Sequence, residues 1–356
     1  MNMKVATPFV QRREQLAGLM LGTAVGDALG LPAEGLSPGR IARRWPGKWQ
    51  HRFIAGRGMW SDDTEHMLCV AVALLTAGDS PGQFQRELAR RLRWWFAGLP
   101  AGVGLATARA CLKLWLGVSP ARSGVFSAGN GPAMRSALIG ACFADDAKRR
   151  RDFTAASTRI THTDPRAFTA ALAVAEAAAW VARGEPSRLA LLQMLPALGE
   201  DAEWKAACDS MRTGLEQGES VAGFACGLGA EHGVSGYAYQ TVPVALFAWL
   251  RHPQDFEAAL TSALDCGGDT DTVGAIVGAL AGAEVGAAGI PAEWVTGIAE
   301  WPRDTDFVRR LAEELAGNTG RVPPGAWWRG PATLPRNLLF LAIVLTHGAR
   351  RLLPPY

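Results

Sequence analysis

Apolar residues recur along this chain at the spacing that places them on one face of a helix, and strict alternation of β-branched and polar residues is scarce. The segment Thr64–Ala77 is apolar nearly all round, which indicates a helix buried on most of its sides. A second helix is predicted after Asp164, which can cap it, with Pro165 in the first turn and Gly184 beyond its end. The pattern therefore predicts an all-α protein.

A third helix is predicted to begin near Asp271, and its glycines share one face because they are four residues apart. These glycines are Gly274, Gly278, Gly282 and Gly286. Each costs about 1 kcal/mol of helix propensity relative to alanine. We expect the close approach of a neighbouring helix to offset this cost, which places the helix at the centre of a bundle.

Breaks rich in proline and glycine interrupt the helical pattern at three places. They are Leu31–Gly47, Ser119–Pro132 and Gly317–Pro335. Only the last is typical of a linker, because a final apolar helix, Arg336–Leu353, follows it. We expect one main domain at residues 1–317. Residues 318–356, a proline-rich segment and a C-terminal helix, are expected to pack on the same domain.

The composition is that of a globular protein, since 49% of the 356 residues are apolar and 19% are charged. The net charge is +3, and the basic clusters Arg86–Arg93 and Lys148–Arg151 are expected to be solvated faces, so no nucleic-acid partner is predicted. Six cysteines without a CxxC pair favour free thiols and a reducing, cytoplasmic location. The N-terminus lacks the apolar core of a signal peptide, and the uncharged run Gly233–Leu250 contains polar residues and a proline. We expect a non-membrane protein and a monomer.

Two acidic clusters each stand at the start of a strongly apolar helix. Ser61-Asp62-Asp63-Thr64 follows Trp60, and Asp269-Thr270-Asp271-Thr272 follows a Gly-Gly pair. One interpretation is N-capping, because serine and aspartate satisfy the free amides of a helix start. A cap needs only one such residue, however, and crowded carboxylates repel one another unless a cation compensates them, so a metal site is favoured. Carboxylate and hydroxyl oxygens suit Mg²⁺, Mn²⁺ or Ca²⁺ rather than Zn²⁺, and four carboxylates could hold two cations.

Several short motifs together make the chain resemble the ADP-ribosylglycohydrolase family, which includes the dinitrogenase-reductase-activating glycohydrolases and the ADP-ribosylhydrolases. The motifs occur in the order of the family: Gly26-Asp27-Ala28-Leu29-Gly30 with Pro32 and Glu34, Ser61-Asp62-Asp63-Thr64, Gly129-Asn130-Gly131 with Met134-Arg135, Thr161-His162 with Pro165, and Gly267-Gly268-Asp269-Thr270-Asp271-Thr272. Each motif is weak alone, whereas their order over nearly the whole chain is specific.

The resemblance implies a compact orthogonal bundle of many helices, with a catalytic domain at residues 1–317 and a binuclear Mg²⁺ or Mn²⁺ centre. The implied ligands are Ser61, Asp62, Asp63, Asp269, Asp271 and Thr272. Ser61 stands where relatives commonly have threonine, and it keeps the hydroxyl. Glu34 matches a glutamate near the metals, and its alternative is a surface carboxylate. The residues implied to be catalytic are Glu34, Asp62, Asp63, Asp269 and Asp271.

A glycine-rich loop ahead of a helix start is the expected contact with the substrate. The loop Ser127-Ala128-Gly129-Asn130-Gly131 leads to Met134 and Arg135, and free backbone amides in such a turn can bind a pyrophosphate. A Gly-Asn-Gly triplet alone is usually only a turn, so the assignment depends on the family pattern. Arg135 could instead support the loop from behind. On this interpretation Asn130→Ala weakens ADP-ribose binding and leaves metal affinity nearly unchanged.

Two further residues concern the expected surroundings of the substrate. A histidine before a helix start is often structural, but the family residue that matches His162 lies near bound ADP-ribose, which favours contact. Gly102 stands where some relatives carry an acid close to the scissile bond, so the linkage specificity stays open.

The sequence therefore predicts a metal-dependent hydrolase that removes ADP-ribose from modified protein side chains, with arginine N-linkages first and serine-type O-linkages second. Two alternatives stay open: hydrolysis of a small ADP-ribose-containing or nucleoside-like molecule, and a non-catalytic relative that binds ADP-ribose. The retained carboxylates argue against the second. Terpene-synthase-like enzymes require a DDxxD motif, and here His66 occupies its last position.

Overall fold

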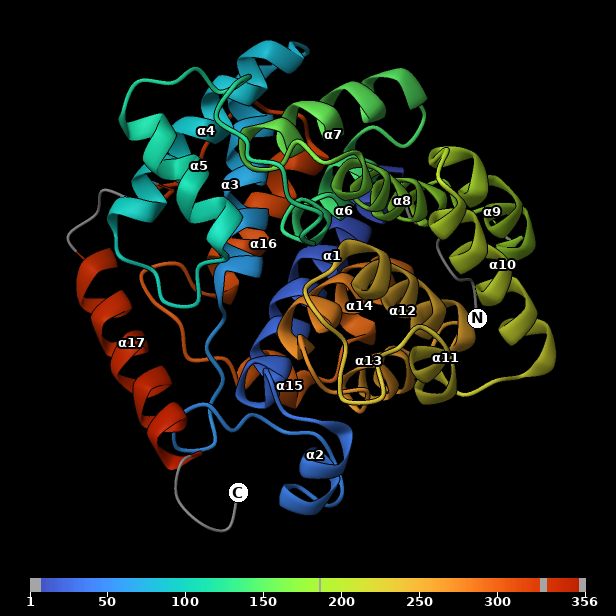
Figure 1. Cartoon of the computed structure of the whole chain (residues 1–356). Coiled ribbons are helices and arrows are strands. Elements are labelled where there is room, and N and C mark those ends of the chain that lie inside the picture. The colour runs from blue at the N-terminus through green and yellow to red at the C-terminus, as the bar shows by residue number, and fades with distance from the viewer. Residues whose placement is uncertain (1–7, 186, 327–331, 352–356) are drawn as a thin grey trace, which may run out of the picture.

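The computed structural model describes residues 8–185, 187–326 and 332–351, which form helices and no sheet (Figure 1). The α-helices are α1 (Pro8–Gly30), α2 (Pro38–Arg44), α3 (Asp62–Ala77), α4 (Pro81–Ala97), α5 (Leu105–Trp115), α6 (Ala137–Cys142), α7 (Ala147–Thr161), α8 (Pro165–Ala182), α9 (Arg188–Met194), α10 (Ala202–Gln217), α11 (Val221–Gly227), α12 (Ala238–Arg251), α13 (Phe256–Leu264), α14 (Thr270–Val285), α15 (Ala292–Thr296), α16 (Thr305–Ala316) and α17 (Thr333–Arg350). Short 3-10 helices are η1 (Leu31–Ala33), η2 (Ala133–Arg135), η3 (Leu195–Leu198) and η4 (Ala287–Gly289). Extended segments of these residues meet only as isolated bridges. The predicted all-α class is confirmed.

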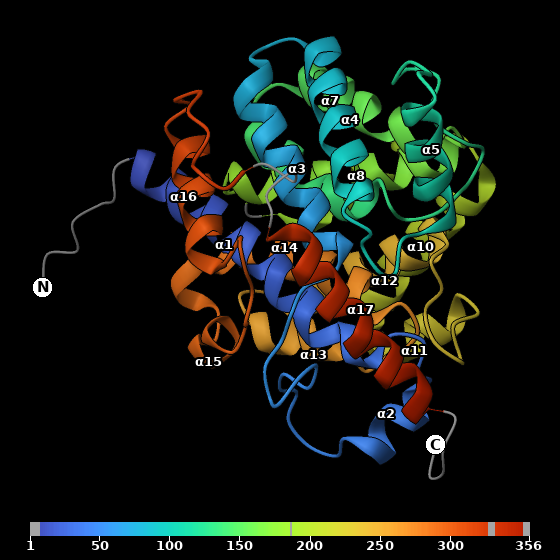
Figure 2. The same cartoon turned by 90° about the vertical axis from the view of Figure 1, so that its left-hand side faces the viewer.

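Helices α1 and α14 lie side by side at the centre of the bundle, and their backbones are in close contact (Figures 1 and 2). A Cβ atom added to Gly22 of α1 would lie 2.0 Å from the carbonyl oxygen of Gly278, and one added to Gly26 would lie 2.0 Å from that of Gly274. No side chain fits in this space, so the predicted close approach of a neighbouring helix is confirmed. Gly286 is a correction, because it follows the last residue of α14 at a φ of 71° and caps the helix end.

Helix α1 contributes its own row of glycines to this contact, and that row was not among the predicted features. The row consists of Gly18, Gly22, Gly26 and Gly30, at the same spacing of four. Among the described residues, α1 is also the helix long and apolar enough to cross a bilayer, but its apolar window within Phe9–Ala33 is entirely buried inside the protein. A core helix passes the same test as a membrane span, and the position of α1 accounts for its composition.

The two other helices singled out in the sequence form close to their predicted bounds. Helix α3 is buried along almost its whole length, as its uniformly apolar sequence indicates. Helix α8 starts at Pro165, and the side chain of Asp164 accepts a hydrogen bond from the backbone N of Arg166, so Asp164 is the predicted cap.

The basic clusters are only partly the solvated faces that were expected. Arg91 and Arg150 are buried. Arg150 forms a bidentate ion pair with Glu176, in which Nε donates to Oε1 at 2.8 Å and Nη2 donates to Oε2 at 2.7 Å. These two arginines are therefore part of the buried interior and not of a solvated face, and a buried charge needs a partner.

Helix α17 crosses one side of the bundle and is attached to it near both ends (red in Figure 1). Near its start, the buried Arg336 pairs with Glu300 at 2.9 Å and donates to the carbonyl oxygen of Trp60 at 2.6 Å. Near its end, Arg351 donates to the carbonyl oxygen of Glu34 at 2.7 Å. The C-terminal helix thus contacts the residue directly before the first acidic cluster and the turn that carries Glu34.

The helix predicted at Arg336–Leu353 is described from Thr333 to Arg350, so it begins earlier than expected. Its predicted last residues, Leu352 and Leu353, lie outside the described residues, as do residues 327–331 of the predicted linker.

Candidate active site

A buried carboxylate on α1 anchors the first acidic cluster. Asp27 accepts hydrogen bonds from the backbone N of Ser61 at 2.9 Å, from the backbone N of Thr64 at 3.0 Å and from the Thr64 hydroxyl at 2.6 Å. Asp27 thus caps α3 from a neighbouring helix. Burial raises the pKa of Asp27 to about 6, and the hydrogen bond from the Thr64 hydroxyl opposes that shift. Asp27 was not predicted as a site residue, although a single aspartate within the apolar run of α1 is a visible signal.

Asp63 joins the two acidic clusters. Its Oδ2 accepts from the Ser61 hydroxyl at 3.1 Å and from the Thr272 hydroxyl at 3.3 Å, although Thr272 lies 209 residues further along the chain. Its Oδ1 is buried and has no hydrogen-bond partner among the described residues. A buried oxygen without a donor is costly, so this atom is a candidate ligand for a cation.

Negative charge accumulates where the clusters meet. Burial, followed by the charge of Asp27, raises the pKa of Asp62 and of Asp63 well above the ordinary value. Burial, followed by the charge of Glu34, does the same to the pKa of Asp271. No three His, Cys, Asp or Glu side chains in the described ranges stand at the spacing of a formed metal site. A bound cation would therefore have to draw these carboxylates together, and it would relieve their repulsion.

The turn before Asp269 has a geometry that only glycine accepts. Gly267 and Gly268 have φ values of 67° and 80°, and a Cβ on Gly268 would lie 2.0 Å from the carbonyl oxygen of Val234. The carbonyl oxygen of Gly268 accepts from the backbone N of Gly35 at 2.7 Å, and Asp269 N donates to Val234 at 2.7 Å. The second acidic cluster is therefore fixed to two neighbouring loops.

A pocket of about 510 Å³ opens between the acidic clusters and the glycine-rich loop. Most of the predicted site residues line it, namely Glu34, Asp62, Asp269, Asp271, Thr272, Ser127, Gly129, Asn130, Gly131, Met134 and His162. Three do not: Ser61 and Asp63, which belong to the first cluster, and Arg135. Ser235 and Gly236 also line the pocket, from a loop that was not predicted to belong to the site.

Glu34 is exposed at this pocket, in the turn between η1 and α2. Desolvation by the surrounding protein, followed by the charge of Asp269, raises the pKa of its carboxyl. The exposure of Glu34 agrees with the alternative of a surface carboxylate. Its acidic neighbours, however, belong to the candidate site, which agrees with a position near the proposed metals.

Asn130 connects the glycine-rich loop to the second acidic cluster. Its side-chain amide donates to Oδ2 of Asp269 at 2.7 Å and to the Thr241 hydroxyl at 3.0 Å. Its backbone N donates to the carbonyl oxygen of Gly236 at 3.0 Å, and the backbone N of Gly129 donates to the Ser127 hydroxyl at 3.3 Å. The expectation that the loop amides are free is thus corrected for these two residues.

Arg135 supports the loop from behind, which corrects its predicted contact with substrate. Its side chain is fully buried. The guanidinium donates to the carbonyl oxygen of Gly131 at 2.9 Å, to the Ser157 hydroxyl at 3.0 Å and to the Thr161 hydroxyl at 2.8 Å. Burial lowers the pKa of Arg135 to about 10, so the group remains charged at neutral pH.

His162 lies beneath the loop and forms part of the pocket wall. A Cβ added to Gly129 would lie 3.1 Å from its Nε2, and one added to Gly131 would lie 3.2 Å from its Cε1. Burial, followed by the charge of Arg135, lowers the pKa of His162 to about 3, so the ring is neutral at physiological pH. His162 thus lines the pocket, as a residue near the substrate would, and it also supports the loop, as a structural residue would.

The chain is similar to known proteins along most of its length. The family profile described as ADP-ribosylglycohydrolase matches residues 9–324. The chain belongs to the ADP-ribosylglycohydrolase family. The predicted resemblance and the predicted hydrolase class are thereby confirmed. Helix α17 begins beyond the residues that match this ADP-ribosylglycohydrolase profile.

Individual proteins are also similar to this chain over most of its length. An uncharacterised protein of Archaeoglobus fulgidus is 32% identical, over 85% of this chain and 96% of its own length. ADP-ribosylarginine hydrolase Tri1 of Pseudomonas putida is 27% identical, over 88% of this chain and 80% of its own length. A solved structure titled ADP-ribosylglycohydrolase-related protein complex has a TM-score of 0.69 at 29% identity, and the match covers 87% of this chain and 99% of that one.

Proposed function

We propose that the chain hydrolyses the glycosidic bond between ADP-ribose and a protein side chain, with two divalent cations, Mg²⁺ or Mn²⁺, as cofactors. The observation that carries the proposal is the meeting of two acidic clusters with a glycine-rich loop around one pocket of about 510 Å³. The acidic side of this pocket suits cations and ribose hydroxyls, and the loop side would bind a pyrophosphate through groups other than the amides of Gly129 and Asn130, which already have partners.

The proposed metal ligands are Ser61, Asp62, Asp63, Asp269, Asp271 and Thr272. All of them are hard oxygen donors, which Mg²⁺ and Mn²⁺ prefer. The buried Oδ1 of Asp63, without a hydrogen-bond partner in the described ranges, supports this assignment. When bound, the cations would supply a Lewis acid that orients the ribose hydroxyls and acidifies a water molecule.

The residues of the chain itself would bind the substrate and move one proton. Glu34 would hold a proton of the attacking water at its carboxylate, a role that suits a carboxyl whose pKa is raised. The acidic surroundings would stabilise positive charge on the ribose as the bond from the anomeric carbon to the leaving nitrogen or oxygen breaks. His162, neutral because its pKa is lowered to about 3, would offer a hydrogen bond without adding a charge.

An arginine linkage is the first choice for the scissile bond, and a serine-type linkage is the second. The relative from Pseudomonas putida is named for ADP-ribosylarginine, and it is 27% identical to this chain. Gly102 lines the pocket and supplies no acid, so any protonation of the leaving group would depend on other residues.

The test is hydrolysis of two synthetic peptides, one mono-ADP-ribosylated on arginine and one on serine, with Mn²⁺ or with a chelator. We expect release of ADP-ribose from the arginine peptide with Mn²⁺ and none with chelator. Asp269→Asn should abolish the release, whereas Asp265→Asn, at an exposed carboxylate that accepts from Trp49 at 2.8 Å, should not. Equal rates with and without chelator would refute the metal, and no release from either peptide would refute the proposed substrate class.

A further inference from the structure

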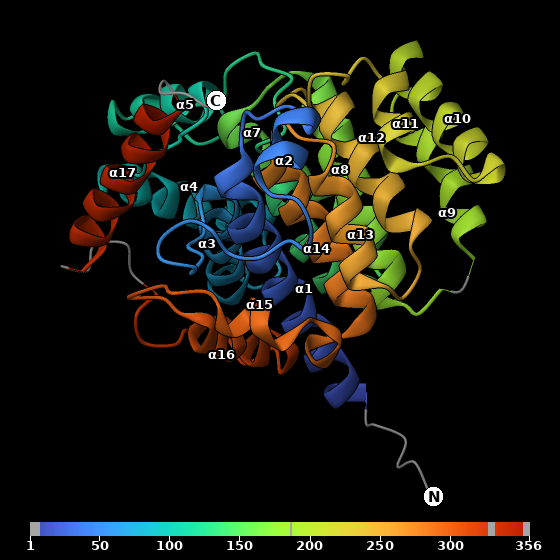
Figure 3. The same ribbon diagram turned by 90° about the horizontal axis from the view of Figure 1, so that it is seen from below.

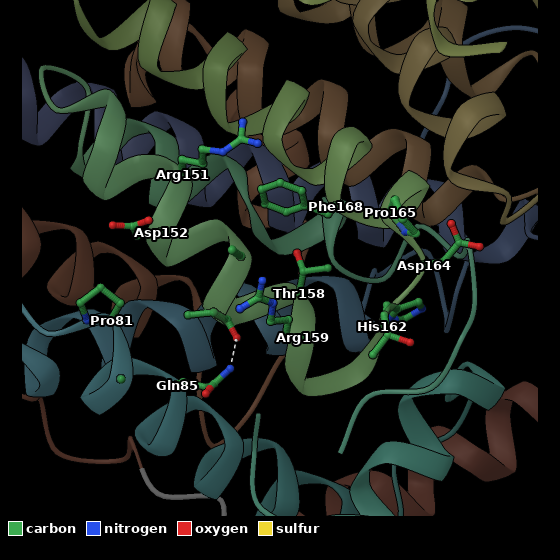
Figure 4. A pocket seen from close by; sticks show the side chains of 14 residues that line it. Pro81, Gln85, Arg151, Asp152, Thr158, Arg159, His162, Asp164, Pro165 and Phe168 are labelled. Carbon is green, nitrogen blue, oxygen red and sulfur yellow. Dashed lines mark hydrogen bonds between the residues drawn. The ribbon is translucent and has the colours of Figure 1, made fainter. Parts of the chain in front are cut away.

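A second and larger cavity adjoins the candidate active site. It has a volume of about 680 Å³ and lies between the start of α4, one face of α7 and the start of α8 (Figure 4). His162 lines both this cavity and the pocket of the candidate active site, so the two share part of one wall. Whatever occupies the second cavity is therefore a neighbour of the group bound in the first.

Two arginines of α7 dominate the charge of this cavity, which we call the arginine pocket. Arg151 and Arg159 line it and are exposed. Arg151 lies over the ring of Phe168, with its guanidinium carbon 5.2 Å from the ring centre. In Figure 4 the side chain of Arg159 extends between α7 and the Gln85 side chain of α4.

The carboxylates that line the arginine pocket already have basic partners. Asp152 pairs with Lys148 at 2.7 Å, and Asp164 pairs with Arg166 at 2.7 Å. Neither Arg151 nor Arg159 forms an ion pair with a residue of the described ranges 8–185, 187–326 and 332–351. The arginine pocket therefore presents a positive charge that the protein does not compensate, and it favours an anionic ligand.

The spacing of the two arginines decides between one anion and several. Their backbones are eight residues apart on one helix, which is about 12 Å along its axis. The two side chains start from backbone positions farther apart than one phosphate or carboxylate is wide, so two separate anionic groups suit them better than a single anion. An extended peptide advances about 3.3 Å per residue, so acidic side chains three or four residues apart match the spacing.

We propose that the arginine pocket binds an acidic stretch of the protein that carries the ADP-ribose, next to the modified side chain. This inference rests on the proposed function, because it assigns the substrate class of the same enzyme. The pocket would raise the affinity for modified proteins with acidic residues near the modification. Exposed charge pairs act over the Debye length, so the preference would weaken with salt.

The experiment compares three substrates: a peptide mono-ADP-ribosylated on arginine with aspartates three and four residues away on both sides, the same peptide with glutamines there, and free ADP-ribosylarginine. For the wild-type enzyme we expect a KM about fivefold lower for the acidic peptide than for the neutral one, the size expected of two exposed charge pairs. The double variant Arg151→Glu with Arg159→Glu should lose this difference. Its kinetics with free ADP-ribosylarginine should stay unchanged.

The matched control reverses the charge of two arginines on another side of the molecule. Arg309→Glu with Arg310→Glu changes the same charge on α16, where Arg310 lies 6.0 Å from the ring centre of Phe307. Helices α1 and α14 lie between α16 and the α7–α8 region (Figure 3). The control should keep the preference for the acidic peptide.

The outcomes separate this inference from the proposed function. Equal KM values for the acidic and neutral peptides in the wild type would overturn the arginine pocket while hydrolysis itself upholds the enzyme. A loss of activity toward free ADP-ribosylarginine in the Arg151/Arg159 variant would also overturn the proposed arginine pocket, since the substitutions would then act on more than peptide binding. If no substrate is hydrolysed, calorimetry with the ADP-ribosylated acidic and neutral peptides decides: tighter binding of the acidic peptide that the double variant lacks supports the pocket, and equal affinities refute it.

Discussion

The side-chain amide of Asn130 donates a 2.7 Å hydrogen bond to Oδ2 of Asp269, across 139 residues of sequence. The bond joins the loop assigned to the pyrophosphate to a carboxylate assigned to a cation. A charge-assisted hydrogen bond of this kind orients its acceptor. The two halves of the proposed site are therefore mechanically connected.

Asn130→Ala should consequently weaken the binding of both ADP-ribose and Mn²⁺. The glycine-rich turn considered alone predicts a loss of ADP-ribose affinity only. Removing a hydrogen bond to a charged group costs about 1.5–3 kcal/mol, so we expect a loss of roughly tenfold or more in metal affinity. Calorimetric titrations with Mn²⁺ and with ADP-ribose measure both effects, and an unchanged Mn²⁺ affinity would restore the simpler prediction.

Mg²⁺ or Mn²⁺ should stabilise the folded protein through both acidic clusters, because only the folded chain brings them together. Linkage gives about 2.7 kcal/mol at a hundredfold excess over the dissociation constant, or a rise of a few degrees in Tm. Asp269→Asn should abolish this rise, and it should leave metal-free stability unchanged or higher because it removes repulsion. Melting curves of both proteins with chelator and with Mn²⁺ test this. If the aspartates were only helix caps, cations would shift neither curve.

Glu34→Ala should lower turnover much more than it lowers stability. The side chain is exposed, and such substitutions usually change the free energy of unfolding by no more than about 0.5 kcal/mol. The turn itself is held through backbone atoms, by Gly35 N to Gly268 and by Arg351 to the carbonyl oxygen of Glu34. Measurements of kcat and Tm for the variant test this, and wild-type turnover would leave Glu34 as a surface carboxylate.

Arg336→Met should destabilise the protein by about 3–5 kcal/mol, because it leaves the Glu300 carboxylate buried without its partner. Burial raises the pKa of Glu300, and the charge and hydrogen bond of Arg336 oppose that shift. The double variant Arg336→Met with Glu300→Gln should recover part of the loss. Urea unfolding of the three proteins measures the difference, and a single variant as stable as wild type would show that α17 adds little to the fold.

The contribution of His162 to the free energy of unfolding should fall as the pH is lowered from about 6.5, whereas the buried carboxyls with raised pKa values contribute in the opposite direction. The pKa of His162 is about 3 in the folded protein and near 6.5 when unfolded, so between these values only the unfolded chain binds the proton. Protonation of His162 therefore favours unfolding in that range. His162→Gln should therefore make the protein more stable at pH 5 relative to pH 7 than the wild type is, and urea unfolding of both proteins at the two pH values measures this difference. An unchanged slope would mean that the folded protein accepts the proton.

The local sequence by itself determined several of the helices and where the acidic clusters stand along the chain. Helix α3 follows from an uninterrupted apolar segment, and the start of α8 follows from Asp164 and Pro165, since capping and propensity act within one turn. The glycines of α14 indicated a closely packed neighbouring helix, because their spacing along the helix places them on one face. These features depend on residues a few positions apart.

Tertiary structure decided which side chains face the pocket and which groups they meet. The sequence pattern marks Asn130 and Arg135 alike, but packing against Ser157 and Thr161 of α7 turns Arg135 away from the pocket. Asp27 belongs to the site only because α1 passes the start of α3. Such contacts join residues far apart in the chain, and their geometry depends on how whole helices pack, which no local pattern encodes.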